Sequence, residues 1–341
     1  MFLIIIAFIS LLGLVVLHEF GHFIAAKRFG VKVDEFGIGF PPRLFGKKIG
    51  DTVYSLNLLP LGAFVKMPGE VEHTEDPDSF FKKAIWKRIV IVLAGVISFW
   101  LISFIIFSAI PTGVAISYVK DNTPAALASL KAGDVINSAS VLGDEKNIFK
   151  ISDVQNIIND NKGKEIVLNI QRGGENLNIS VTPRASPPPE EGPLGISLAY
   201  GPSQRNYPLY QAPFKGFLRT AEFTFDIVTG WAGAISKAIK RQPTGVELTG
   251  PVGTFSLFSA ALKEGPQFFL LFFALISLYI AMFNVLPIPS LDGGKLLFLI
   301  IEAVRKRPVS QKVEQVLTTA FFSLLILLMI FVTIKDVIRL F

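Results

Sequence analysis

The chain has 341 residues, of which 51% are hydrophobic and 18% are charged, and its formal net charge is +6. Its mean hydropathy of +0.52 is too high for an ordinary soluble domain, while the charged fraction indicates that part of the chain contacts water. The absence of cysteine excludes disulfides, thiolate-bound zinc and a cysteine nucleophile.

Four segments are long and apolar enough to cross a bilayer, which takes about 20 residues. We place these spans at residues 1–25, 89–110, 266–294 and 315–334. The first lacks a basic start and a small-residue cleavage site, so we expect a retained helix and not a signal peptide. The sequence therefore predicts a multi-pass α-helical membrane protein with four transmembrane helices.

The first span contains the sequence His18-Glu19-Phe20-Gly21-His22, an H-E-x-x-H pattern. Residues four apart on a helix share a face, so both imidazoles could bind one ion, and Glu19 could take a proton from water activated by that ion. In a soluble chain this pattern is often a coincidence. Inside an apolar span three such residues are costly unless they have a function, so the sequence predicts a Zn²⁺ site.

A catalytic zinc site needs a third protein ligand. The only other histidine, His73, lies in a polar stretch and is not favoured. Asp292 is favoured, because spans one and three run in the same direction and bring their polar residues to the same depth. Pro287 and Pro289 should interrupt the helix just before it. Asn284 could then bond the freed backbone of its own helix or of a substrate.

Lysine and arginine are concentrated in the loop at residues 26–88 and in the short loop at 302–314. The positive-inside rule then places both loops in the cytoplasm and the N-terminus, the segment 110–265 and the C-terminus outside. The metal site would lie in the cytoplasmic part of the membrane. This distribution accounts for the positive charge, so we expect the lipid bilayer and no nucleic acid as a partner.

Two runs within residues 51–67, separated by Pro60-Leu61-Gly62, predict a β-hairpin in the 26–88 loop that dips toward the site. Without further information a plain structural hairpin is equally compatible. Residues 185–213 are expected to form a linker rich in proline and glutamate. Residues 214–241 carry charges at spacings of four, three and four, which favours an amphipathic helix in the membrane interface. A buried soluble helix is the alternative.

Residues 112–184 predict a soluble α+β insert. Lys131-Ala132-Gly133-Asp134 is typical of a turn in PDZ domains, and strands are expected at 165–171 and 176–182. PDZ domains bind extended peptide ends by strand addition. The insert could bind the new end of a trimmed substrate, or it could exclude substrates that still carry a bulky ectodomain.

These motifs together resemble the site-2 protease family of intramembrane zinc metalloproteases, in particular the bacterial regulator-of-sigma-E type. The resemblance is carried by residues 18–23, 36–40, 60–67, 250–253 and 284–294. It implies that Zn²⁺ is bound by His18, His22 and Asp292 and that Glu19 activates water. It also implies a single PDZ domain outside the bacterial cytoplasmic membrane.

The resemblance further implies which substrates are cleaved and how they are held. Single-span membrane proteins, trimmed beforehand by another protease, would be cut within or near their transmembrane segments, as in regulated intramembrane proteolysis of anti-sigma factors or signal-peptide remnants. The hairpin around Gly62 would offer a strand edge to an unwound substrate. Asn284, Pro287 and Pro289 would also contact that substrate.

The chain departs from the usual pattern of this family at Ala63, Val96, Ser98, Ser290 and Lys295. None of these departures removes a predicted ligand or the predicted base. They bear on the packing of the second span and on substrate preference.

Three other functions are compatible with parts of this sequence: a catalytically silent scaffold that presents the insert, a zinc transporter, and a membrane-tethered protease for soluble substrates. The complete His-Glu-His-Asp set argues against the scaffold. A transporter would need a polar path across the whole membrane, and a tethered protease is expected to carry its motif in a soluble domain.

Overall fold

The computed structural model describes residues 2–70, 74–188, 191–203, 208–242 and 249–340. It divides into two compact units. The first, here called the membrane unit, comprises Met1–Ile105 and Phe217–Phe341, and the second, the insert unit, comprises Ile106–Gly216.

The prediction of four transmembrane helices is confirmed within the described residues. The four helices are α1 (Phe2–Arg28), α2 (Ile85–Ala109), α7 (Pro266–Val285) and α9 (Gln311–Leu340). They are accompanied by α5 (Ala212–Ile239), α6 (Pro251–Lys263) and α8 (Asp292–Arg305). The sequence did not lead us to expect α6 or α8.

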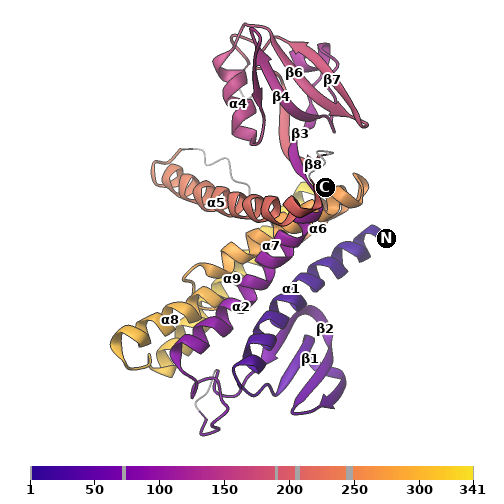
Figure 1. Ribbon diagram of the computed structural model, residues 1–341. Helices are drawn as coiled ribbons and strands as arrows, with labels where there is room; N and C mark the ends of the chain where they lie inside the picture. The colour runs from indigo at the N-terminus through magenta and orange to yellow at the C-terminus, as the bar shows by residue number, and fades with distance from the viewer. Residues whose placement is uncertain (1, 71–73, 189–190, 204–207, 243–248, 341) are drawn as a thin grey trace. The chain divides into compact units, whose positions relative to one another are not determined.

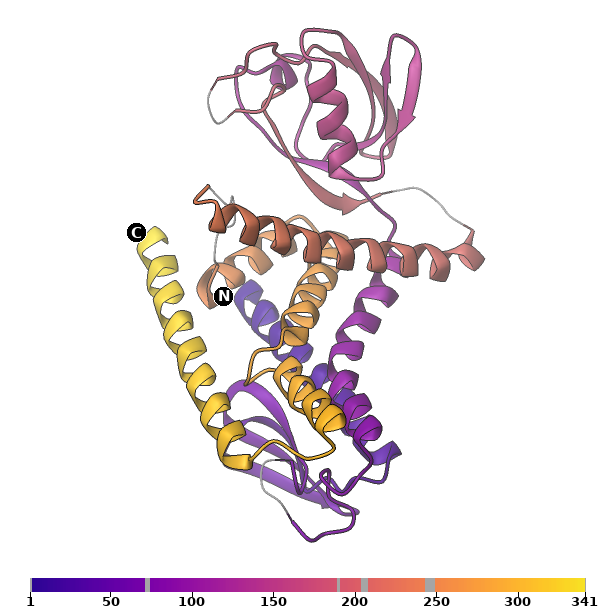
Figure 2. The ribbon, with the colours of Figure 1, turned by 90° about the vertical axis from the view of Figure 1, so that its left-hand side faces the viewer.

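The third span is shorter than expected. Helix α7 ends at Val285, and the predicted span 266–294 therefore includes a loop and the start of α8, a separate helix (Figure 2). Pro287 and Pro289 lie in this loop, where their missing N–H groups cannot interrupt a helical hydrogen-bond ladder. The interruption itself was expected from these prolines.

Helices α1, α2 and α7 share a core that contains Leu14, Val96, Phe99 and Ala281. Two buried hydrogen bonds between α2 and α7 reinforce it. The Ser103 hydroxyl donates to the Ala274 carbonyl at 2.8 Å, and the Ser277 hydroxyl donates to the Phe99 carbonyl at 2.9 Å. Such bonds between helices hold apolar spans together where the surrounding lipid offers no hydrophobic driving force.

Strands β1 (Glu35–Ile49) and β2 (Thr52–Lys66) form a sheet at the C-terminal end of α1 (Figure 1). Its pairing corrects the hairpin predicted within 51–67. Residues 43–49 pair with 52–57, whereas 35–38 pair with both 53–56 and 63–66. The two runs of β2 are thus separated by the first part of β1.

Glycines in β1 explain why this pairing was missed. The run Phe36-Gly37-Ile38-Gly39-Phe40 contains two glycines, which are depleted in strands. In the sheet a glycine is needed at position 37, because a Cβ there would lie 2.4 Å from the Phe64 ring. Within the described residues, the segment 63–66 of β2 has a strand partner along one side only, and its other edge is free.

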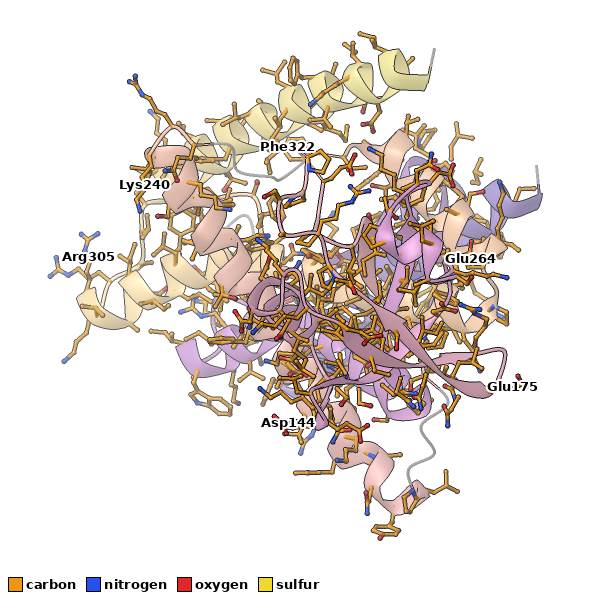
Figure 3. The ribbon with its side chains drawn as sticks, turned by 90° about the horizontal axis from the view of Figure 1, so that it is seen from above. Asp144, Glu175, Lys240, Glu264, Arg305 and Phe322 are labelled. Atoms are coloured by element: carbon orange, nitrogen blue, oxygen red, sulfur yellow. The ribbon has the colours of Figure 1, made fainter. Side chains whose placement is uncertain are left out.

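The insert unit is an α+β fold around a sheet with strand order β7-β6-β4-β3-β8 and β5 paired to β4. Its strands are β3 (Thr112–Val119), β4 (Val135–Val141), β5 (Asp144–Asn147), β6 (Ile166–Arg172), β7 (Glu175–Val181) and β8 (Ile196–Pro202). Helices α3 (Pro124–Leu127) and α4 (Ile151–Asp160) and a 3-10 turn at Leu209–Gln211 complete it. Asp144 and Glu175, labelled in Figure 3, begin the second strands of its two hairpins.

The strands of the insert unit agree with the sequence predictions at β6 and β7 and differ from them at β8. Strands β6 and β7 match the expected strands at 165–171 and 176–182 within one residue at each end. Strand β8, in contrast, lies within residues 185–213, which were expected to be a linker, and it pairs with β3 from Thr112↔Pro202 to Val119↔Ile196. The fold of the insert therefore extends well beyond residue 184.

The predicted turn around Gly133 is organised by a buried carboxylate. Asp134 is fully buried, accepts the backbone N–H of Lys131 at 2.8 Å, and binds the Arg172 guanidinium through both oxygens at 2.6 Å. Gly133 has φ +91°, which a side chain would disfavour. This network joins the turn before β4 to the end of β6.

Helix α5 begins and ends within two residues of the predicted 214–241 segment. Phe223 and Ile227 are buried, whereas Phe214, Phe225 and Val228 are exposed. Exposed apolar side chains of this kind suit contact with lipid, but the interfacial location of α5 stays a prediction.

Candidate metal centre

The centre is built where α1 crosses α2, and two glycines allow these helices to approach closely. A Cβ on Gly21 would lie 2.4 Å from the Ala94 carbonyl oxygen. A Cβ on Gly95 would lie 2.3 Å from Nε2 of His22 and 2.5 Å from Cε1 of His18. Both imidazoles of α1 therefore lie directly against the backbone of α2.

Three ligand-type atoms converge there, as the sequence predicts. Nε2 of His18 and Nε2 of His22 lie 3.2 Å apart, and each lies 3.3 Å from Oδ2 of Asp292. Both histidines are buried, and the Asp292 side chain is 13% exposed. Within the described residues this is the one group of three such side chains close enough to hold a metal ion.

The spacing of these atoms fits a zinc ion. Ligand atoms about 2.0–2.1 Å from zinc at the tetrahedral angle lie about 3.3–3.4 Å from one another. The observed triangle has edges of 3.2, 3.3 and 3.3 Å. Oδ2 of Asp292 is also buried without a well-formed hydrogen bond from any described residue, and a cation would satisfy it. Two nitrogens and one carboxylate oxygen form a donor set that leaves the fourth position open.

Contacts with α2 orient both rings. Nδ1 of His22 lies 2.8 Å from the Ile91 carbonyl oxygen, so this nitrogen carries the proton and donates, and the lone pair of Nε2 faces the site. The His18 ring stacks on Phe99, with centroids 4.8 Å apart and planes 19° apart. The two imidazoles are therefore held before any metal is bound.

Asp292 reaches the histidines because the loop after α7 turns sharply. It is the first residue of α8, after Leu291 in an extended conformation. A Cβ on Gly293 would lie 2.1 Å from the Leu286 carbonyl oxygen, and one on Gly294 would lie 2.4 Å from that of Ile288. The two glycines thus allow the first turn of α8 to pack on its own preceding loop.

Glu19 opens onto a cavity of 190 Å³ that is also lined by two of the three ligand residues, His22 and Asp292. The cavity is lined by residues of α1, β2, α2 and α8 and by two residues that follow β2: Glu19, His22, Phe64, Val65, Met67, Glu70, Ile91, Val92, Asp292 and Lys295. The Glu19 carboxylate therefore lies close to candidate metal ligands, with space for a reacting group between the surrounding side chains. This arrangement suits hydrolysis assisted by a metal.

The four residues expected to contact substrate are not among those that line this cavity. The Asn284 amide donates to the Ile280 carbonyl of its own helix at 3.0 Å, a carbonyl that lies within α7 and not among those that the two prolines would free. Pro287 is exposed and Pro289 buried in the loop before α8, and Gly62 packs against Phe40. Their roles toward substrate stay predictions, and His73 lies outside the described residues.

The structure adds residues that sequence reasoning did not assign to the site. Gly95 is one, and a glycine in the middle of an otherwise apolar span could have indicated a close approach of two helices. Glu70 and Lys295 are the others, and no local pattern connects two residues 225 positions apart.

Comparison with known proteins identifies the family of this chain. The model of peptidase family M50 matches residues 6–328. The protein CPE1693 of Clostridium perfringens, whose name places it among zinc metalloproteases, is 33% identical over 347 residues that cover 98% of each chain. The regulator of sigma-W protease RasP of Bacillus subtilis is 29% identical over 426 residues that cover 99% of each chain. This chain therefore belongs to peptidase family M50, the site-2 protease family, and is a multi-pass membrane zinc metalloprotease.

Proposed function

We propose that this protein hydrolyses peptide bonds within or next to transmembrane segments of other membrane proteins. The observation that carries the proposal is that Asp292 meets His18 and His22 of a span-forming helix beside the cavity lined by Glu19 of the same helix. Ionisable groups at membrane depth are costly, so a complete hydrolytic set in that position points to a substrate that is itself in the membrane.

In this proposal His18, His22 and Asp292 hold zinc, which supplies Lewis-acid polarisation of the scissile carbonyl and of water. Glu19 takes the proton of the attacking water and passes it to the leaving nitrogen as the C–N bond breaks. The hydrogen bond from His22 to Ile91 keeps the imidazole in the tautomer that can bind metal.

The free edge at residues 63–66 offers a way to hold an unwound substrate. A peptide bond inside a helix is shielded by helical hydrogen bonds, so the substrate helix must open locally before cleavage. An extended segment added to this edge would gain backbone hydrogen bonds without a sequence requirement. Phe64 and Val65 of this edge line the same cavity as Glu19, which would bring the added strand close to the base.

The insert unit supports a second contact with substrate. A cavity of 330 Å³ lies between α4 and the start of β8, lined by Gln155, Ile158 and Asn159 on one side and residues 192–198 on the other. Strand β8 is at the edge of its sheet. We propose that an extended peptide end, such as that left by an earlier cleavage, binds along β8 in the manner of a PDZ ligand.

Two ion pairs hold the loop before β8. Glu191 pairs with Lys120 at 2.6 Å and with Arg184 at 2.7 Å. These partners, Lys120 foremost, hold the pKa of the Glu191 carboxyl below its usual range. Both pairs are therefore present at neutral pH, where a peptide would bind.

We further propose that the 26–88 and 302–314 loops are cytoplasmic and that the insert unit is extracytoplasmic, on the distribution of basic residues. The relative from Bacillus subtilis is named a regulator of sigma-W protease. We therefore propose single-span anti-sigma factors, trimmed outside the membrane by another protease, as the substrate class.

The test is co-expression of wild type and Glu19→Gln with single-span substrates, followed by mass spectrometry of the fragments. We expect cleavage within or near the substrate span only with the wild type, while Glu19→Gln retains zinc. Fragments of the same mass from a zinc-loaded Glu19→Gln protein would overturn the proposed role of this residue.

A further inference from the structure

An ion pair lies in the wall of the Glu19 cavity and joins two parts of the site that are distant in sequence. Lys295, in the first turn of α8, donates to a carboxylate oxygen of Glu70. The Glu70 side chain is 15% exposed, and that of Lys295 is 44% exposed. Glu70 follows the end of β2 by four residues, and Lys295 follows the metal-type ligand Asp292 by three.

The pair separates two cavities. Glu70 and Lys295 line both the 190 Å³ cavity that holds Glu19 and a second cavity of 60 Å³, which is also lined by Arg88, Phe298 and Glu302. The two residues of the ion pair are therefore part of the lining that both cavities share. Opening the pair would change the lining of the Glu19 cavity and the position of the chain segment that follows β2.

We propose that Glu70 and Lys295 form a clasp that fixes the distance between the edge at 63–66 and the zinc ligand Asp292. Both are positioning residues in this account, and the inference rests on the proposed function. The clasp would keep a strand-bound peptide at the right separation from Glu19 and the metal.

The other contacts of this edge explain why such a clasp is needed. Residues 63–66 have strand partners on one side only within the described chain. Beyond Lys66, the backbone is held by hydrogen bonds from Asp34 to the Lys66 carbonyl at 2.9 Å and from Phe80 to the Pro68 carbonyl at 2.8 Å. Neither of these bonds reaches α8, whereas the Glu70–Lys295 pair does.

The rate of cleavage depends on the distance between the reacting atoms. Reacting atoms must be held about 3–3.5 Å apart, and a displacement of about 1 Å can cost on the order of 100-fold in rate. Peptide binding to the edge depends on backbone hydrogen bonds that the clasp does not make. Loss of the clasp should therefore lower kcat and change KM little.

The experiment compares Lys295→Met, Glu70→Gln and the exchanged pair Glu70→Lys/Lys295→Glu with the wild type, in detergent-solubilised full-length protein. The probe is a single-span substrate that the wild type cleaves. The readouts are kcat, KM, zinc per chain and the thermal unfolding midpoint. Lys295→Arg keeps the charge and should keep most of the activity.

A matched control is the exposed pair Lys82–Glu75, whose atoms lie 3.0 Å apart in the same loop. We expect Glu75→Lys/Lys82→Glu to be indistinguishable from the wild type. We expect Lys295→Met and Glu70→Gln each to lower kcat by about 10- to 100-fold with one zinc per chain. The exchanged pair should recover a large part of that loss.

Three results would overturn the clasp. These are wild-type kcat in both single variants, an exchanged pair no better than the singles, or a loss of zinc that accounts for the loss of activity. If the wild type itself cleaves no membrane substrate while binding zinc, the proposed function fails instead. The two failures are therefore distinguishable.

Discussion

Replacement of Gly95 by alanine should disable the metal centre although Gly95 is neither a ligand nor a base. The added Cβ would lie 2.3 Å from Nε2 of His22 and 2.5 Å from Cε1 of His18. Carbon and nitrogen atoms in ordinary contact lie about 3.5 Å or more apart, so the helices or rings must shift by about 1 Å.

That shift is larger than the site can absorb. Bond lengths to zinc vary by about 0.2 Å between good sites, and a shift of about 1 Å moves a ligand out of its bonding position. We expect zinc affinity to fall by at least about 10- to 100-fold, as when the groups that orient a ligand are lost. This corresponds to about 1.4–2.8 kcal/mol of binding free energy.

The assay is competition with a zinc chelator on purified protein, together with cleavage of a membrane substrate. Gly13→Ala in α1 is the matched control, because its added Cβ would meet no atom within 4 Å beyond its chain neighbours and the local backbone of its own helix. An alanine in a helix is favoured over glycine by about 1 kcal/mol, so the control should fold at least as well as the wild type. Wild-type zinc affinity and cleavage in Gly95→Ala would refute the reasoning.

Three further predictions concern other parts of the chain. Asp134→Ala should destabilise the insert unit by about 2–3 kcal/mol, because the substitution removes charge-assisted bonds to the Arg172 guanidinium. Proteolysis of the insert in the full-length variant should be faster than in the wild type, and an unchanged rate would contradict this prediction. Ser277→Ala should cost about 0.6 kcal/mol of helix association, measured by unfolding in mixed detergent, and a neutral effect would count against the α2–α7 bond. The pKa of the Glu191 carboxyl is lowered by Lys120 and by a second cation, so its ion pairs should persist through the ordinary carboxyl range and be lost only as pH falls further, through the lowered pKa. Hydrogen exchange in the loop before β8 that does not rise at that lower pH, after correction for the intrinsic rate, would contradict this.

Most of the site could be predicted from sequence because three of its four residues lie close together in the chain. His18, Glu19 and His22 lie within one helical turn, and their cost inside an apolar span indicated a function. Asp292 followed from a topology argument on charge, and it lies 3.3 Å from both histidine nitrogens. The four spans were visible as apolar windows long enough to cross a membrane.

Features that depend on distant pairing could not be predicted in the same way. Strand β8 reads as a linker because Pro- and Glu-rich residues precede it, and only its partner β3 makes it a strand. The placement of residues 35–38 between the two runs of β2 depends on glycines that weaken the strand pattern. The Glu70–Lys295 pair carries no local signature at all.

The measurement that tests the central claim most directly is the zinc content of full-length protein with single substitutions at each proposed ligand. We expect one zinc per chain in the wild type, close to none in His18→Ala, His22→Ala and Asp292→Ala, and one in Glu19→Gln. His73→Ala is the control and should keep its zinc. Full zinc content in Asp292→Ala, or loss of zinc in His73→Ala, would contradict the three-ligand site.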